Sequence, residues 1–231
     1  MKRLAIIPAR GGSKRIPRKN IKDFLGKPII AYSIEAALNS GVFDEVMVST
    51  DDEEIATVAR QFGAEVPFMR SSKNADDFAT TADVIIEVVQ EYKNIGRAFD
   101  TLCCIYPTAP FVTAERLKEG GVLLEKQDYD SVVPMVRFSF PIQRAVYLNE
   151  YNQAFFFQPE HIQSRSQDLQ SSYHDVGQYY WLSTTKFIEN KQIWTQNTGA
   201  IILDEMETQD IDTLEDWEIA EFKYQLKHGK Q

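Results

Sequence analysis

A short segment near the N-terminus concentrates basic side chains that can hold phosphate groups. Residues 9–20 read ARGGSKRIPRKN and include no acidic residue. Arginine offers a planar fork for phosphate oxygens and lysine a mobile point charge, while the two glycines let the backbone approach a ligand. The segment lacks the G-x-x-x-x-G-K-[ST] and G-x-G-x-x-G patterns of common nucleotide-binding loops. It therefore indicates either a different phosphate site or a solvated basic surface.

The charge of the remaining chain narrows the kind of ligand. Residues 1–27 hold nine Lys/Arg and one Asp, whereas the whole chain has a formal net charge of -9. Proteins that bind nucleic acids usually present a broad basic face to the phosphate backbone. We therefore expect no nucleic-acid partner, and a compact polyphosphate suits this short loop better.

A pair of acids near the C-terminus is the second candidate site. In DIDTLED (210–216), Asp210 and Asp212 lie two residues apart, so an extended backbone directs both carboxylates to one side. Such a pair suits a hard cation such as Mg²⁺. The alternative is helix capping, in which Asp212 or Thr213 accepts hydrogen bonds from the backbone of a following helix.

Strand and helix patterns alternate along the chain and must position these residues. Short apolar runs predict strands at 4–8, 44–50, 64–68, 101–107, 130–136 and 199–204. Apolar periodicity and end signals predict helices at 28–41, 50–63, 81–96, 113–126 and 212–229. This order predicts an α/β fold with a mostly parallel sheet and helices on both faces. Ligands bind beyond the carboxyl ends of such strands, and the basic segment follows the first strand, which favours the phosphate interpretation.

Two helices allow more detailed expectations. The spacing of Thr50 and Glu53 predicts a capping box at the start of the helix within 50–63. The last helix offers four apolar side chains for burial: Leu214, Trp217, Phe222 and Leu226.

Residues 137–180 interrupt the alternation. They are rich in aromatic residues and glutamine and have no clear helical period. We interpret the chain as one domain, 1–231, in which this segment is an arm or lid, or else a plain structural extension. Exposed aromatic side chains there would favour packing on a second subunit.

The cysteines and the N-terminus limit the cellular context. Cys103 and Cys104 are adjacent in a predicted strand, so their side chains point to opposite faces and a disulfide between them is not expected. The apolar run in MKRLAIIPAR is too short for a signal peptide or a membrane span. We expect a cytoplasmic protein without a membrane partner.

Five segments together resemble the CMP-sialic acid synthetases, or acylneuraminate cytidylyltransferases. IPARGGSKRIPRKN, VSTDDEEIA, YPTAPF, GQYYW and DIDTLED occur in that family's order and approximate spacing over nearly the whole chain. The resemblance implies a Rossmann-like nucleotidyltransferase sheet and a homodimer joined through an extended dimerisation arm. It further implies transfer of CMP from CTP to the anomeric hydroxyl of an acidic 2-keto sugar, with release of pyrophosphate.

The same resemblance assigns the nucleotide half of the site. It implies that CTP is held by Arg10, Gly11, Ser13, Lys14, Lys19, Asn20 and Arg70. Lys14 and Lys19 would neutralise charge during transfer, an electrostatic role expected in such reactions. Asp210 and Asp212 would bind Mg²⁺, so the catalytic set is Lys14, Lys19 and Asp212.

One departure concerns the sugar. Tyr106 stands where sialic acid synthetases have Gln in Q-P-T-S-P, and with FPIQRA (140–145) and DVGQYYW (175–181) the chain is more similar to the pseudaminic acid cytidylyltransferase subgroup. The resemblance then implies that the sugar is contacted by Tyr106, Gln143, Arg144, Gln178 and Tyr180.

Other functions stay open at this stage. The same reaction on N-acetylneuraminic or legionaminic acid is the nearest alternative. A 3-deoxy-manno-octulosonate cytidylyltransferase is disfavoured because an acid expected near YPTAP is absent. A phosphatase with an Asp nucleophile would need D-x-D after the first strand, which instead ends in IIPAR. A non-catalytic nucleotide-binding module is the alternative from another class.

Overall fold

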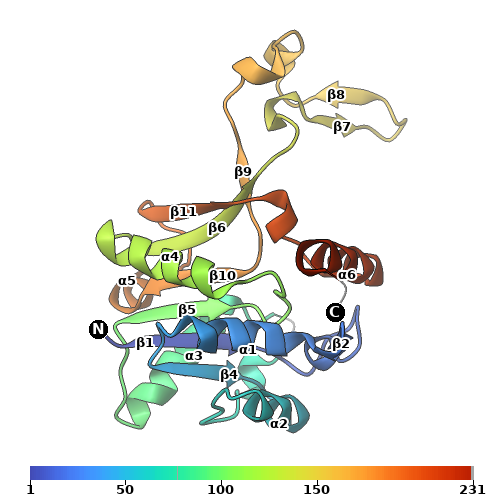
Figure 1. Ribbon diagram of the computed structural model, residues 1–231. Coiled ribbons are helices and arrows are strands. Elements are labelled where there is room, and N and C mark those ends of the chain that lie inside the picture. The colour runs from blue at the N-terminus through green and yellow to red at the C-terminus, as the bar shows by residue number, and fades with distance from the viewer. Residues whose placement is uncertain (77, 230–231) are drawn as a thin grey trace.

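A central sheet organises the part of the chain that the computed structural model describes, residues 1–76 and 78–229 (Figure 1). Its order is β11-β6-β10-β5-β1-β4, and β9 pairs with β6. The strands are β1 (Arg3–Pro8), β4 (Glu45–Ser49), β5 (Thr101–Ile105), β6 (Ser131–Arg137), β9 (Tyr173–Asp175), β10 (Tyr179–Ser183) and β11 (Thr198–Leu203). All run in one direction except β9 and β10. The predicted mostly parallel sheet is confirmed.

Helices cover both faces of this sheet, as expected. They are α1 (Ile29–Ser40), α2 (Glu53–Gln61), α3 (Thr81–Asn94), α4 (Ala114–Lys126), α5 (Thr184–Asn190) and α6 (Leu214–His228). The apolar sides of α1, α2 and α4 pack into one core cluster, and those of α3 and α5 into another on the opposite face. A third cluster joins α1 to α6 and a small hairpin of β2 (Asp23–Phe24) and β3 (Lys27–Pro28). The two main clusters lie on the faces of the sheet, so the carboxyl ends of its strands are open for a site.

The adjacent cysteines in β5 illustrate the two faces. Cys103 belongs to the cluster that contains Trp181, and Cys104 to the cluster that contains Leu182. Both thiols are free and fully buried, and burial raises the pKa of each. The two side chains point to opposite faces of the sheet, as the sequence predicts for adjacent strand residues.

The strand predicted at 64–68 is wrong. Glu65 forms only an isolated bridge with Met47, in which its N–H donates to Val46 and its carbonyl accepts from Val48. Pro67 follows two residues later and has no N–H for a ladder hydrogen bond. The segment therefore touches the edge of the sheet at one point and turns away.

Two helices differ from sequence expectations, α2 at its cap and α6 in the burial of its apolar side chains. Helix α2 is capped by Asp52, whose carboxylate accepts from Glu54 and Ile55, and not by Thr50. In α6, Trp217 is buried against Phe24.

Three of the four side chains expected to be buried in α6 are exposed instead: Leu214, Phe222 and Leu226. The apolar spacing predicted the helix correctly, but only its Trp217 side meets the domain.

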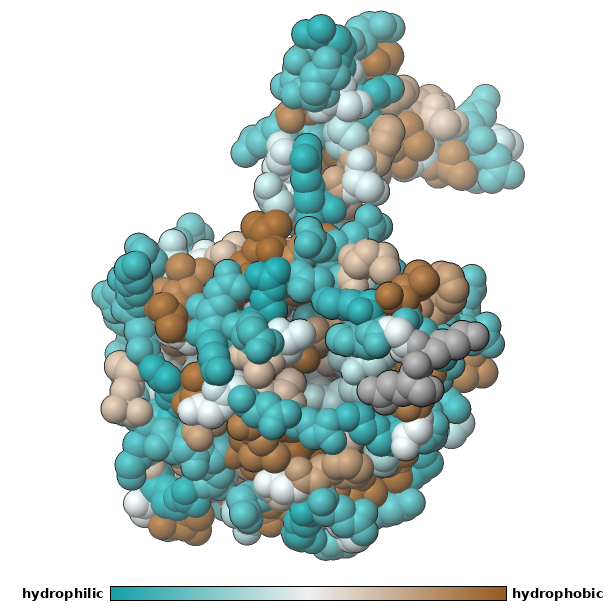
Figure 2. Space-filling model, in the orientation of Figure 1, coloured by the Kyte–Doolittle hydropathy of each residue, from teal (hydrophilic) through white to brown (hydrophobic). Residues whose placement is uncertain are grey.

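Residues 138–172 project from the sheet as an arm, on a stalk made by β6 and β9 (Figure 1). The arm contains the hairpin of β7 (Val146–Leu148) and β8 (Ala154–Phe156) and several short 3-10 turns. Many of its apolar side chains are exposed, and Figure 2 shows them gathered among polar residues. Within the described ranges, no helix has both the length and the apolar character needed to cross a membrane.

Candidate active site

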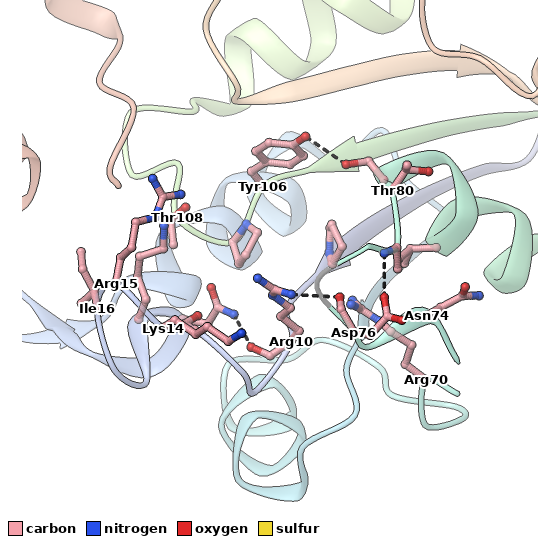
Figure 3. A pocket seen from close by; sticks show the side chains of 18 residues that line it. Arg10, Lys14, Arg15, Ile16, Arg70, Asn74, Asp76, Thr80, Tyr106 and Thr108 are labelled. Atoms are coloured by element: carbon pink, nitrogen blue, oxygen red, sulfur yellow. Dashed lines mark hydrogen bonds between the residues drawn. The ribbon is translucent and has the colours of Figure 1, made fainter. Parts of the chain in front are cut away.

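A cavity of about 290 Å³ opens at the carboxyl ends of β1 and β5 (Figure 3). Its wall is formed by the loop after β1, by the segment that leads into α3, and by the turn after β5. The lining includes all predicted nucleotide-binding residues except Gly11: Arg10, Ser13, Lys14, Lys19, Asn20 and Arg70. The fold thus places the basic loop where the alternation of strands and helices predicts a ligand.

Gly11 and Asn20 shape the loop. The N–H of Gly11 donates to Asp51 Oδ1 at 3.0 Å, and a Cβ at Gly11 would lie 2.7 Å from Asp52 Oδ2. A larger residue would therefore push the loop away from α2. Asn20 is buried, and its Nδ2 donates to the carbonyl of Arg10 at 2.8 Å. These contacts hold both ends of the loop.

Arg18 anchors the loop to α2 and does not line the cavity. It has a positive φ of 56° and pairs with Asp52 and Glu54. The hydrogen bond from Arg18 is the main reason that the pKa of Asp52 falls to about 2. The Asp52 carboxylate therefore caps α2 and also holds the basic loop after β1.

Arg70 reaches the cavity wall from a buried position. Its Nε donates to Ser49 Oγ at 3.0 Å, and its Nη2 donates to the carbonyl of Ser49 at the end of β4. The residue is only 8% exposed, and burial lowers the pKa of its guanidinium. The fork is thus held in one orientation, which only the tertiary structure specifies.

Lys19 connects the loop to the acidic pair. Its Nζ donates to the carbonyl of Ile211 at 2.6 Å and lies 3.6 Å from Asp212 Oδ1. Burial lowers the pKa of Lys19, while the charge of Asp212 acts in the opposite direction. Arg15 Nη2 donates to the same Asp212 oxygen at 2.7 Å. The two sequence candidates, loop and acids, therefore meet at one place.

Helix capping does not use the Asp212 carboxylate. Thr213 is the N-cap of α6, and its Oγ1 accepts from the N–H of Asp216. Asp216 in turn accepts from the N–H groups of Asp212 and Thr213. The capping interpretation is correct for Thr213 and leaves the side chain of Asp212 available for other partners.

The carboxylate of Asp212 influences that of Asp210. Loss of surrounding water, followed by the charge of Asp212, raises the pKa of Asp210. Two mutually repelling carboxylates are hard donors that suit Mg²⁺ in chemistry. In residues 1–76 and 78–229 no cluster of three or more His, Cys, Asp or Glu side chains could hold a metal. A cation here would need further oxygen ligands from water or from a bound phosphate.

The predicted sugar-binding residues fall into two groups. Tyr106 lines the cavity, and the ring of Tyr180 packs against it at 5.6 Å. Gln178 is buried, and its Nε2 donates to the backbone carbonyl of Glu207 at 2.6 Å. The backbone carbonyl of Gln178 accepts from the N–H of Tyr106. Gln178 and Tyr180 therefore contact Tyr106 and hold it in position.

Gln143 and Arg144 form the second group and lie on the arm, in a 3-10 turn (Ile142–Arg144). Gln143 Nε2 donates to Gln170 at 2.9 Å, and Arg144 lies over the ring of Phe140. Neither lines the cavity of the same chain. The structure separates them from Tyr106.

Several cavity residues were not predicted from the sequence: Arg15, Asn74, Asp76, Thr80 and Thr81. Arg10 Nη1 donates to the carbonyl of Asp76 at 2.9 Å, and Thr80 caps α3. A polar stretch after a lone arginine, Arg70, was the available signal. Such stretches are usually solvated, so the sequence alone does not assign these residues to a site.

Comparisons with known proteins identify the family of this chain. Residues 4–227 match the family described as Cytidylyltransferase. Pseudaminic acid cytidylyltransferase of Campylobacter jejuni is 45% identical, over 99% of this chain and 98% of the relative. CMP-N,N'-diacetyllegionaminic acid synthase of Legionella pneumophila is 34% identical, over 96% and 95% of the two chains.

A solved structure is similar in fold. A CMP:2-keto-3-deoxy-manno-octonic acid synthetase complexed with CTP aligns with a TM-score of 0.70 over 98% of this chain and all of its own, at 19% identity. The sequence motifs, the fold of the sheet and the relatives that match over nearly their whole length all indicate the same family. The chain belongs to the cytidylyltransferase family and is an enzyme of the nucleotidyltransferase type.

Proposed function

We propose that this enzyme transfers CMP from CTP to the anomeric hydroxyl of pseudaminic acid and releases pyrophosphate, with Mg²⁺ as its cofactor. The observation that carries the proposal is the meeting of the basic loop with the acidic pair, through Lys19 and Arg15 on Asp212. Phosphates and a cation are the groups that such opposite charges would hold together. The identity to pseudaminic acid cytidylyltransferase of Campylobacter jejuni supports the choice of sugar.

The nucleotide would lie in the cavity after β1. Ser13 and Lys14 come from the loop wall, where they would bind phosphate oxygens. Lys14 and Lys19 would neutralise the charge that develops as pyrophosphate leaves. Arg70, fixed on Ser49, would contact the cytosine end of CTP. Gly11 and Asn20 would act by holding the loop in shape.

Asp210 and Asp212 would hold Mg²⁺ together with oxygens of the substrate. When bound, the cation supplies charge neutralisation and a lower pKa for a hydroxyl that contacts it. The raised pKa of Asp210 is consistent with a carboxylate pair in need of a counter-charge. Arg15 and Lys19 supply part of that charge in the structure described here.

The sugar would meet an aromatic wall. Burial raises the pKa of Tyr106 and of Tyr180, so both are neutral phenols at neutral pH and unsuited to act as bases. A ring and a neutral hydroxyl suit a sugar that ends in a methyl group where sialic acid carries a hydroxyl. The same reaction on N-acetylneuraminic or legionaminic acid is the competing assignment, since relatives with those names share the fold.

The enzyme would act as a homodimer in the cytoplasm. Gln143 and Arg144 lie on the arm, beside exposed apolar side chains such as Phe140 and Val146. Contact with a second subunit would remove that apolar surface from water. Light scattering should therefore give twice the mass of the 26.5 kDa chain. A monomer at micromolar concentration would contradict the dimer without affecting the reaction.

The decisive experiment is pyrophosphate release from CTP and Mg²⁺ with pseudaminic, N-acetylneuraminic and legionaminic acids supplied separately. We expect turnover with pseudaminic acid, none without sugar, and little with UTP in place of CTP. Turnover with another sugar alone would overturn the substrate assignment. Binding of CTP without turnover on any of the three would overturn the proposed reaction.

A further inference from the structure

A line of side chains in contact, through hydrogen bonds and one ring pair, connects the stalk of the arm to the cavity wall. The hydroxyl of Tyr180, in β10, donates to Asp175 Oδ2 at 2.6 Å. The Tyr180 ring packs edge-on against Tyr106, with an interplanar angle of 74°. The hydroxyl of Tyr106 in turn lies 3.0 Å from Thr81 Oγ1 at the start of α3. Figure 3 shows Tyr106 on this wall of the cavity. Asp175 is thus two side chains away from the cavity.

The Asp175 carboxylate is fixed on both of its oxygens. Oδ1 accepts from the N–H of Gly177 at 2.9 Å, in a turn where Gly177 has a φ of 59°. The backbone of Asp175 pairs with Met135 in β6. Because β6 and β9 are also the stalk of the arm, Asp175 has one rigid position relative to the sheet.

The backbone of Tyr106 is also fixed on both sides. Its N–H donates to the carbonyl of Gln178 at 2.7 Å, and its carbonyl accepts from Ser33 Oγ at 2.7 Å. What these contacts leave undetermined is the orientation of the Tyr106 ring and the direction of its hydroxyl. The neighbouring Tyr180 ring and Thr81 set both.

We propose that Asp175 is a positioning residue for the sugar: by accepting the hydrogen bond of Tyr180 it holds the ring that keeps the Tyr106 hydroxyl at the cavity wall. Asp175 does not line the cavity and therefore acts through Tyr180 and Tyr106. The inference rests on the proposed function, in which Tyr106 meets the sugar. It assigns specificity to a residue at the root of the arm, so a change in the stalk would be transmitted to the sugar subsite and not to the nucleotide subsite.

The different effect expected on the sugar and nucleotide subsites follows from the contacts of their residues. The nucleotide residues Arg10, Asn20 and Arg70 are held by other partners, namely Asp76, the loop backbone and Ser49. The Asp175 carboxylate instead accepts its hydrogen bonds from Gly177 and Tyr180. A purely structural role for Asp175 would instead weaken the whole domain and affect both substrates together.

The test uses the full-length enzyme with Asp175→Asn, which keeps the size and one acceptor oxygen, and Tyr180→Phe. Pyrophosphate release at saturating CTP gives KM and kcat for the sugar, and calorimetry gives the Kd for CTP. We expect the sugar KM to rise about tenfold in both variants, as for loss of one charge-assisted hydrogen bond. The Kd for CTP and the kcat should stay near the wild-type values.

Two further variants complete the test. Asp128→Asn removes one negative charge from the exposed turn after α4 and should leave all three constants unchanged. In a Tyr106→Phe background, adding Asp175→Asn should raise the sugar KM no further, because both changes act through one hydroxyl. Independent, multiplying effects, or a joint rise of the sugar KM and the CTP Kd, would overturn the inference.

A readout without turnover separates this inference from the proposed function. If the wild-type enzyme turned over no sugar, the proposed function would fail. The position of Tyr106 is then judged by its ring signals in ¹³C-tyrosine-labelled protein, assigned with Tyr106→Phe. We expect Asp175→Asn to shift these signals and Asp128→Asn to leave them in place. Unchanged Tyr106 signals in Asp175→Asn would overturn the positioning role.

Discussion

The guanidinium of Arg15 donates to Asp212 Oδ1 at 2.7 Å, and this pair joins two segments 197 residues apart in the chain. Lys19 lies 3.6 Å from the same oxygen. A cation that binds Asp212 must therefore compete with two basic side chains. Changes to Asp212 and changes to its basic partners should therefore have different effects.

The first prediction concerns Arg15→Ala and the affinity for Mg²⁺ without nucleotide. Because Arg15 and the cation would share one carboxylate, we expect Mg²⁺ to bind about two- to fivefold more tightly, the scale of an exposed ion pair. Calorimetry measures this directly. Lys186→Ala, which removes a positive charge from an exposed position on α5, is the control and should not change the affinity. Weaker binding in Arg15→Ala would show that Arg15 helps to form the site.

The second prediction concerns Asp212→Asn. Turnover should be lost while the melting temperature stays near the wild-type value, because the cap of α6 is made by Thr213 and Asp216. Thr213→Ala is the matched control and should lower stability by about 1 kcal/mol yet retain turnover. Pyrophosphate release and thermal unfolding by circular dichroism give the two readings. Full activity in Asp212→Asn would exclude Asp212 from the catalytic set.

The third prediction concerns Arg70→Lys. An ammonium cannot reproduce the fork that contacts both the hydroxyl and the carbonyl of Ser49. We expect a loss of about 1–3 kcal/mol in the free energy of unfolding by urea, together with weaker CTP binding. Arg60→Lys, at an exposed position on α2, is the control and should change neither quantity. Unchanged CTP affinity would remove Arg70 from the nucleotide subsite.

The fourth prediction concerns acid stability and Asp52. Arg18 lowers the pKa of Asp52 to about 2 in the folded protein, below the ordinary value of 3.8. The sign follows from linkage: the charged form is favoured by folding, so its contribution is present above pH 4 and disappears as the pH falls from about 4 to about 2. Asp52→Asn should therefore be less stable than wild type at pH 7 and approach it near pH 2.

Urea unfolding between pH 2 and pH 7 measures this difference. Since Asp52 is partly exposed, we expect no more than about 1 kcal/mol at pH 7. Glu53→Gln, in the first turn of the same helix, is the control for a general loss of charge. An equal difference between wild type and Asp52→Asn at all pH values would contradict the role of the Arg18 pair.

Local sequence patterns predicted the elements well where the chain itself carries the physical signal. Periodicity identified α1, α2, α3, α4 and α6, and the apolar runs identified β1, β4, β5, β6 and β11. The central strand β10 and the short helix α5 were not predicted. The wrong strand at 64–68 shows the limit, because one bridge to Met47 depends on where Pro67 directs the chain. The exposure of Phe222 and Leu226 shows another, since an apolar spacing does not say whether a partner surface exists.

The sequence by itself determined the chemistry of the site: a basic loop with Gly11 after the first strand, and the spacing of Asp210 and Asp212. These are local features, set by backbone conformation and side-chain alternation. Only the tertiary structure decided that Arg15 and Lys19 meet Asp212, and that Asp175 reaches the cavity through Tyr180. Such pairs depend on how distant elements pack, and packing is a property of the whole core that no short stretch of sequence contains.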